Sequence, residues 1–172
     1  YSLYIHKGTT TLSKCLIFKI DGTAVAIDNG ASVIADRITV TRSKSAITLQ
    51  DQSSLKITDS YLQDNNSNAI IVYTGSRAEI SGCLLEQHTY PALFVRGESS
   101  VQVTDCRFTN NDYHGVDIEQ SAAIFECCTF SNNKKVNIHI CMQSDVQLLN
   151  CEIEQSGEFG YGIYCEHSKL QI

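Results

Sequence analysis

The chain has 172 residues, of which 42% are apolar and 19% are charged, and its formal net charge is −6 at pH 7. This length and composition predict one folded domain and exclude a disordered chain. The negative charge argues against nucleic acid or an acidic membrane surface as partner, and no apolar run approaches the ~20 residues of a membrane span.

Seven units of similar sequence follow one another, beginning at residues 8, 31, 53, 76, 99, 121 and 144. Successive units start 22 or 23 residues apart, and parts of further units precede the first and follow the last. A fixed period of this length is the signature of a repeat architecture. We therefore expect a single domain over residues 1–172, cut from a longer array in mid-repeat at both ends.

Each unit contains three short stretches in which inward and outward residues alternate. In the unit that begins at residue 53 they are residues 55–57, 60–62 and 70–72. Alternation with a period of two predicts β-strands, and no unit carries a helical stripe. Three strands per turn of 22–24 residues predict an all-β fold, a parallel β-helix (solenoid) of about seven complete turns.

The corners between the strands have their own composition. A single residue separates the first and second strands, and four of the seven corner residues are the Gly, Asn or Asp that tolerate a left-handed backbone. The seven are Lys14, Arg37, Asp59, Gly82, Asp105, Cys127 and Asn150. A wider corner follows the second strand and carries the amide pairs 65–66, 110–111 and 132–133, which can hydrogen-bond along the stack.

Five of the eight cysteines share one inward position of the unit: Cys15, Cys83, Cys106, Cys128 and Cys151. We interpret them as small apolar side chains that fill a narrow interior, because no CxxC pair or histidine in register supports a metal site. Neighbouring turns are close enough for some of these cysteines to pair as disulfides, so geometry alone does not decide their redox state. With Cys127 and Cys141 expected outside, the cysteine content favours a reducing compartment, so we expect an intracellular, cytoplasmic protein.

The outward positions of the third strand form a stripe of aromatic and charged residues along the solenoid. Asp117 and Glu119 are its carboxylate pair, one residue apart. Tyr73 and Phe94, with Ile71, are predicted to form an exposed apolar patch of the kind that marks contacts. The candidate ligand-binding residues on this stripe are Tyr73, Phe94, Arg96, Asp117, Glu119, His139 and Tyr164.

The corner from Ile80 through Gly82 to Leu85, and the later Gly-Val-x-Ile at residues 115–118, resemble the right-handed parallel β-helix repeat family. The resemblance covers essentially the whole chain. The family includes pectate-lyase-like enzymes and the carbohydrate-binding and sugar-hydrolase domain. The resemblance implies right-handed turns, and in members that act on polysaccharides the strand matching this third strand commonly lines the substrate groove.

The carboxylate pair could also be catalytic, which is the alternative to a role in ligand binding. Asp117 and Glu119 are about 7 Å apart along a strand, inside the window of inverting glycosidases, and His139 and Arg96 flank them. The chain lacks the catalytic motifs of polygalacturonase-like enzymes and the acidic calcium cluster of pectate lyases. No unit carries a long loop that could wall off a groove. We therefore expect no catalytic residues.

No cofactor or metal is expected either, because His88, His114 and His139 share no position and are each predicted to lie on the surface. The hypothesis we favour is a recognition or scaffold module that binds a protein partner through the third-strand face. In its acidic, cysteine-rich and loop-poor character the chain looks like intracellular members of the family, such as F-box proteins with β-helix substrate domains and the Shc-binding cytokinesis scaffold.

Two alternatives stay open. The first is a carbohydrate-binding or polysaccharide-degrading domain that uses the same face, with Tyr73 and Phe94 as platforms for sugar rings. The second is a structural stalk without a ligand, which would associate end to end through its open edge strands.

Overall fold

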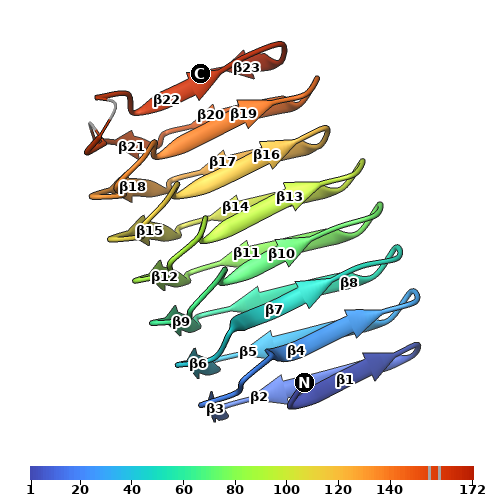
Figure 1. Cartoon of the computed structure of the whole chain (residues 1–172). Helices are drawn as coiled ribbons and strands as arrows, with labels where there is room; N and C mark the ends of the chain where they lie inside the picture. Colours follow the sequence, from blue (N-terminus) through green and yellow to red (C-terminus); the bar gives the residue numbers. More distant parts are fainter. Residues whose placement is uncertain (155, 159) are drawn as a thin grey trace.

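The computed structural model describes residues 1–154, 156–158 and 160–172. The described residues form 23 β-strands, arranged as stacked turns with the two chain ends at opposite ends of the stack (Figure 1). Among these residues, no helix has the length and apolar content needed to cross a membrane.

Each turn contributes one strand to each of three parallel sheets, which we name A, B and C. Sheet A, the third strand of each repeat, contains β1 (Leu3–His6), β4 (Thr23–Asp28), β7 (Ser45–Leu49), β10 (Ile70–Val72), β13 (Leu93–Arg96), β16 (Val116–Glu119), β19 (Ile138–Cys141) and β22 (Ile163–Cys165).

Sheet B contains β2 (Thr9–Ser13), β5 (Ser32–Asp36), β8 (Ser54–Thr58), β11 (Arg77–Ser81), β14 (Ser100–Thr104), β17 (Ala122–Glu126), β20 (Asp145–Leu149) and β23 (Lys169–Gln171). Sheet C contains β3 (Leu16–Phe18), β6 (Thr39–Thr41), β9 (Tyr61–Gln63), β12 (Leu84–Glu86), β15 (Arg107–Thr109), β18 (Thr129–Ser131) and β21 (Glu152–Ile153). The predicted parallel solenoid of about seven turns is therefore confirmed.

The register places equivalent residues of successive turns directly opposite one another. Leu55 of β8 pairs with Ala78 of β11, which in turn pairs with Val101 of β14. Because side chains alternate along each strand, this register stacks every inward residue on its counterpart. The inward ladders that alternation predicts from Leu55 to Val146 and from Ile57 to Leu148 are buried, whereas Ile163, the last member of the predicted sheet A ladder, is partly buried. Phe108, Phe125 and Phe130 pack ring against ring in the core.

All seven one-residue corners between sheets B and C adopt the left-handed backbone, with φ between 48° and 61°. The Gly, Asn and Asp corners fit the prediction, and Lys14, Arg37 and Cys127 adopt the same conformation despite the cost of a Cβ atom there. At Gly82 an added Cβ would lie 2.5 Å from Oδ1 of Asp59 in the preceding turn. The sharp turn is therefore imposed by the stack and not by residue type alone.

The shared-position cysteines complete these corners. The thiol of Cys83 donates to the carbonyl of Ser81, and Cys106 and Cys128 do the same to Thr104 and Glu126, at 3.2–3.3 Å. Ser60 donates from its hydroxyl in the same way, to Thr58. The cysteines at this position thus act as small core residues that also satisfy a corner carbonyl, and all eight cysteines are free.

A buried ladder of polar side chains supports the wider corner after sheet C. Asn65, Asn111 and Asn133 are buried, and each donates from its amide to a carbonyl of the preceding turn. Asn111 also donates to Oδ1 of Asn133 at 2.8 Å. The partners that follow or precede them in the amide pairs, at 66, 110 and 132, are exposed.

His88 occupies the ladder position between Asn65 and Asn111. Its side chain is 0% exposed, and Nε2 lies 2.9 Å from the carbonyl oxygen of Leu62. The prediction of a surface histidine is wrong here, because the residue substitutes for a ladder asparagine. Burial lowers the pKa of His88 to about 4, so the ring is neutral at pH 7.

Candidate functional site

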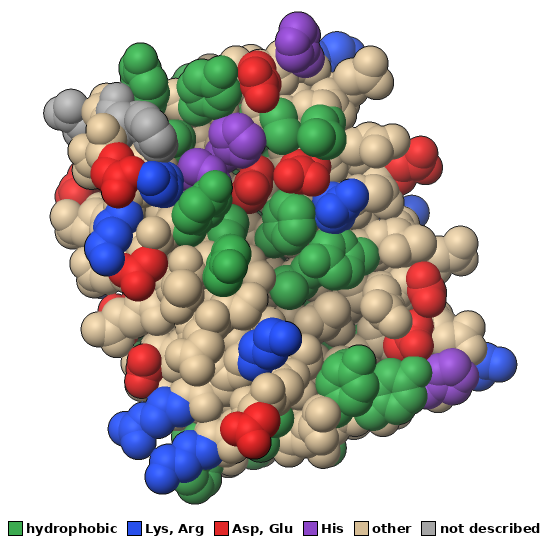
Figure 2. All heavy atoms as spheres, in the orientation of Figure 1, with side chains coloured by type: hydrophobic (Ala, Val, Ile, Leu, Met, Phe, Trp, Pro, Cys, Tyr) green, Lys and Arg blue, Asp and Glu red, His purple; other side chains and the backbone are tan. Residues whose placement is uncertain are grey.

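The outward side of sheet A, which we call the sheet A face, gathers the tyrosines of the chain. Seven of the eight tyrosines lie on its strands or beside their ends, and the eighth, Tyr61, lies on sheet C. The seven are Tyr1, Tyr4, Tyr73, Tyr90, Tyr113, Tyr161 and Tyr164. Figure 2 shows this face, with green side chains beside red carboxylates and purple histidines.

Rings from four turns form a continuous row along the edge of this face. Tyr113 contacts His114 edge-on, with ring centroids 4.4 Å apart. His114 and His139 are near-parallel at 4.9 Å, and His139 and Tyr164 are near-parallel at 5.7 Å. Tyr90 and Tyr161 extend the row beyond Tyr113 and Tyr164. The sequence pattern did not reveal this row, because four of its six members precede the strands.

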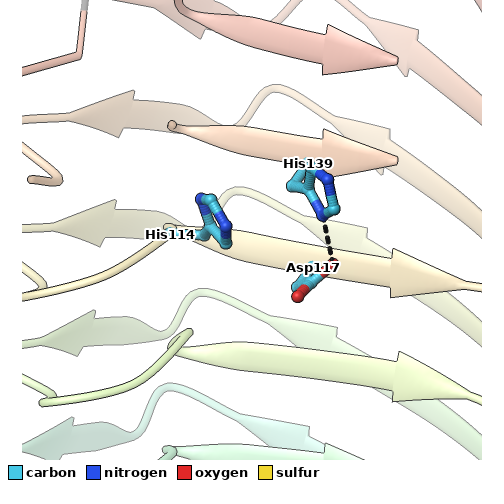
Figure 3. A group of neighbouring side chains, drawn as sticks. All are labelled: His114, Asp117 and His139. Carbon is cyan, nitrogen blue, oxygen red and sulfur yellow. Dashed lines mark hydrogen bonds and ion pairs between the residues drawn. The ribbon is translucent and has the colours of Figure 1, made fainter. Parts of the chain in front are cut away.

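Asp117 and His139 form the centre of the site. Nδ1 of His139 on β19 lies 2.7 Å from Oδ1 of Asp117 on β16, its neighbour in register (Figure 3). Asp117 is 8% exposed, whereas His139 is half-buried. The hydrogen bond to Asp117 raises the pKa of His139, with burial acting against it. The carboxylate therefore fixes the ring and leaves Nε2 to face other groups.

His114 lies just before β16 and is buried, so the prediction that it lies on the surface is also wrong. Its Nδ1 accepts a hydrogen bond from the backbone N–H of Val136, at 3.2 Å. Burial lowers the pKa of His114 to about 4. A neutral ring that accepts at Nδ1 carries its proton on Nε2, so His114 offers a hydrogen-bond donor at Nε2.

Glu119 and Arg96 occupy the second outward position of their strands. Nε of Arg96 lies 3.9 Å from Oε2 of Glu119. Burial, followed by the charge of Asp117, raises the pKa of Glu119. The structure thus brings together the four residues named for the catalytic alternative, Asp117, Glu119, His139 and Arg96.

Cys141 is directly opposite Glu119 in the next strand. Its side chain is on the outward side of sheet A, as predicted. It is nevertheless only 5% exposed, so it is buried and not open to solvent. Burial and the carboxylates of Asp117, Glu119 and Glu166 raise the pKa of the Cys141 thiol to about 11. Cys127, the other cysteine expected outside, is exposed.

Tyr73 and Phe94 contact each other edge to face, with ring centroids 5.9 Å apart. Both are partly buried, and Ile71 beside them is 9% exposed. The apolar patch predicted from the sequence is therefore less exposed than expected, because the two rings shield each other. Burial raises the pKa of Tyr73.

A groove of about 720 Å³ crosses the outward side of the strands from β4 to β16. Tyr73, Phe94, Tyr90 and Tyr113 supply rings to its lining, and Asp117 lies in its wall. Thr48, Ser67 and Asn68 add hydroxyl and amide groups, and Lys44 adds a positive charge. The groove combines flat apolar surface with a few polar groups, which is the composition of ligand sites.

The sequence did not predict three members of this site, Tyr90, Tyr113 and Lys44. The tyrosines had a detectable signal, since both stand three residues before the first residue of a sheet A strand. That position lies outside the alternating stretches, so the period-two pattern could not assign it a face.

The fold and the face together define a β-solenoid with one chemically distinct side. The sequence profile of the right-handed β-helix region matches residues 45–172. The chain therefore belongs to the right-handed β-helix family. No curated protein and no solved structure matches the chain.

Proposed function

We propose that the protein is a recognition module that binds an extended segment of a protein partner along the sheet A face. The observation that carries this proposal is the concentration of seven of the eight tyrosines on one side of the solenoid. Tyrosine and arginine dominate the energetics of protein recognition, since they offer large rigid contact areas with a polar tip.

The shape of the face supports an elongated ligand. The groove crosses five successive sheet A strands, and the aromatic row continues from Tyr113 to Tyr164 beyond it. A segment laid along the solenoid axis would meet rings first, then the Asp117–His139 pair and the Arg96–Glu119 pair. Charges of both signs at the centre would fix its register.

A glycan is the second candidate, because rings and hydrogen-bonding side chains line the same open groove. Tyr73 and Phe94 would stack on sugar faces, and Thr48, Ser67 and Asn68 would bond their hydroxyl groups. Asp117 and Glu119 with His139 would then be placed for acid–base work. The repeat units carry no long loop that could enclose the groove and exclude water. Glycan binding is therefore a simpler use of the groove than catalysis.

Two selections test the proposal: a displayed library of random peptides and a glycan array, each probed with the reduced chain. The variant Tyr90→Ala/Tyr113→Ala removes two rings of the groove, and Tyr61→Ala is the control on sheet C. Peptides that bind the wild type and the control, but lose at least tenfold in affinity for the double variant, support protein recognition. Binding to glycans alone favours the second candidate, and binding to neither contradicts both.

We further propose that the protein works in a reducing compartment. Its eight free cysteines support this, because thiols in an oxidising compartment are usually paired. Fractionation of the source cells tests the proposal, and recovery of the chain with oxidised cysteines from a secreted fraction would contradict it.

A further inference from the structure

Four side chains form a compact block at the centre of the sheet A face. Asp117 and Glu119 project from β16, and His139 and Cys141 lie opposite them on β19 in register. Asp117 and Cys141 are 8% and 5% exposed, so the block is largely removed from water. Imidazole, carboxylate and thiol are the three groups with which proteins bind transition metals.

Three donor atoms of the block converge. One ligand atom each from Asp117, Glu119 and Cys141 lie within 4.8 Å of one another. Donors around a tetrahedral zinc ion are about 3.3–3.8 Å apart, given ligand bonds of about 2.0–2.3 Å. The 4.8 Å bound is wider than this spacing, so binding of an ion would draw the three side chains closer together.

The thiol of Cys141 differs from the other buried thiols. Cys83, Cys106 and Cys128 each donate a hydrogen bond to a backbone carbonyl. Among the described residues, Cys141 is the buried cysteine whose sulfur makes no hydrogen bond. The sulfur of Cys141 is therefore available as a metal ligand, whereas the other three buried thiols already bond to the backbone.

The charges around Cys141 favour a cation. Asp117, Glu119 and Glu166 all act on the thiol through their negative charge, whereas Arg96 is the cation that pairs with Glu119, at 3.9 Å. The side chain of Arg96 is 57% exposed, so it can move away from Glu119 with little cost. A divalent ion would compensate the carboxylates and favour the thiolate over the thiol.

His139 acts on this site through Asp117. Its Nδ1 is 2.7 Å from the Asp117 carboxylate, which holds that carboxylate in place as outer partners of metal ligands commonly do. The alternative cluster of His114, Asp117 and His139 also brings three donors together. His114 does not fit a metal there, because its Nδ1 already accepts from Val136 and its Nε2 carries the proton.

We propose that Asp117, Glu119 and Cys141 form a site for a divalent transition metal of the zinc class, with His139 as a positioning residue. The thiolate selects such ions over calcium and magnesium, which prefer oxygen ligands alone. Cys141 loses its proton to solvent on binding, so one proton is released per ion. Three protein ligands leave one coordination position for water. Of the three ligands, Asp117 lines the groove, and the site does not depend on which ligand the groove binds.

Cobalt(II) is the probe, because a thiolate bound to Co²⁺ gives a charge-transfer band in the near ultraviolet. The reduced, chelator-treated chain is titrated with Co²⁺ and then with Zn²⁺. The expected result is a saturable band at one ion per chain that Zn²⁺ abolishes. Absence of the band from the folded chain would overturn the proposal.

Variants assign the band to its ligands. Cys141→Ser is expected to abolish it, and Glu119→Gln to weaken Co²⁺ binding at least tenfold. The matched control is Cys127→Ser, an exposed thiol at a distant corner, which is expected to keep the band. His139→Gln is expected to keep the band but lose about 10–100-fold in affinity. A band that persists in Cys141→Ser would contradict the assignment, and circular dichroism verifies that each variant is folded.

Discussion

The corners between sheets B and C and the sheet A face use the same stacked backbone in opposite ways. At the corners, Lys, Arg, Asp, Gly, Cys and Asn all adopt one left-handed conformation and do the same work in every turn. On the sheet A face, equivalent positions carry a different side chain in almost every turn, from Ala26 through Phe94 to Asp117 and His139.

This comparison shows where reactive side chains can be placed in a solenoid. The strand register fixes the position of each residue in the stack. A corner residue therefore only has to adopt the required backbone conformation, whereas the outward residues of sheet A can differ in side chain from turn to turn. The acid, imidazole and thiol groups gather on β16 and β19, where they are half-buried or buried. Substitutions in the core and on the sheet A face are therefore expected to differ in their effect on stability.

The largest expected effect comes from a comparison of two phenylalanines. Phe125→Ala removes a ring that is 0% exposed and packs on Phe108 and Phe130, and it is expected to cost about 3–5 kcal/mol of unfolding free energy. Phe94→Ala on the sheet A face is expected to cost about 1–2 kcal/mol, because the ring is partly exposed. Urea denaturation measures both, and equal losses would contradict the division between scaffold and face.

Gly115→Ala is expected to cost about 3 kcal/mol. An added Cβ would lie 2.6 Å from the backbone oxygen of Asn137 and 2.8 Å from Nδ2 of Asn133, at the entrance to β16. The control Gly8→Ala has no atom within 4 Å and a positive φ, so its cost is limited to the left-handed backbone, about 1 kcal/mol. A Gly115→Ala protein as stable as the control would show that the adjacent turns can separate there.

The next effect is a dependence of stability on pH. The pKa of His88 is about 4 in the folded chain, below its value of about 6.5 when unfolded. The unfolded state therefore binds the proton first, and stability falls as pH decreases from about 6.5, with the loss complete below about 4. At pH 5 the loss is about 2 kcal/mol.

His88→Asn tests this dependence, because asparagine occupies the same ladder position at Asn65, Asn111 and Asn133. The variant is expected to lose less stability than the wild type between pH 7 and pH 5, by about 2 kcal/mol. Urea denaturation at the two pH values measures this difference. Parallel stability profiles for the two proteins would show that His88 is not the group responsible.

The smallest effect concerns the corner at Cys127. Cys127 has a φ of 52°, which glycine adopts without a steric penalty. Cys127→Gly is expected to be more stable than Cys127→Ala by about 1 kcal/mol, since alanine keeps the Cβ. Thermal unfolding of the two variants measures the difference, and a more stable alanine variant would be evidence against strain at the corners.

Much of the fold could be predicted because the same sequence pattern recurs in seven units. The Leu55 and Ile57 ladders, the strand order and the corners all follow from period and alternation. The meeting of Asp117, Glu119, His139 and Arg96 was predictable for the same reason, since register alone brings their positions together.

Burial on the outward side was not predictable. Cys141 is buried opposite Glu119, and His114 is buried against the rings of Tyr113 and His139. Alternation carries no information about such cover. His88 was missed because a histidine stands where other turns have asparagine, and the shared role is visible only in its bond to the Leu62 carbonyl.

The claim that the sheet A face is the recognition surface is tested most directly by NMR of the chain with labelled tyrosine rings. The ligand is the strongest binder from the peptide or glycan selection. We predict that the resonances of Tyr73, Tyr90 and Tyr113 shift on titration while that of Tyr61 on sheet C stays fixed. Shifts centred on Tyr61, with the groove tyrosines unchanged, would show that the sheet A face is not the recognition surface.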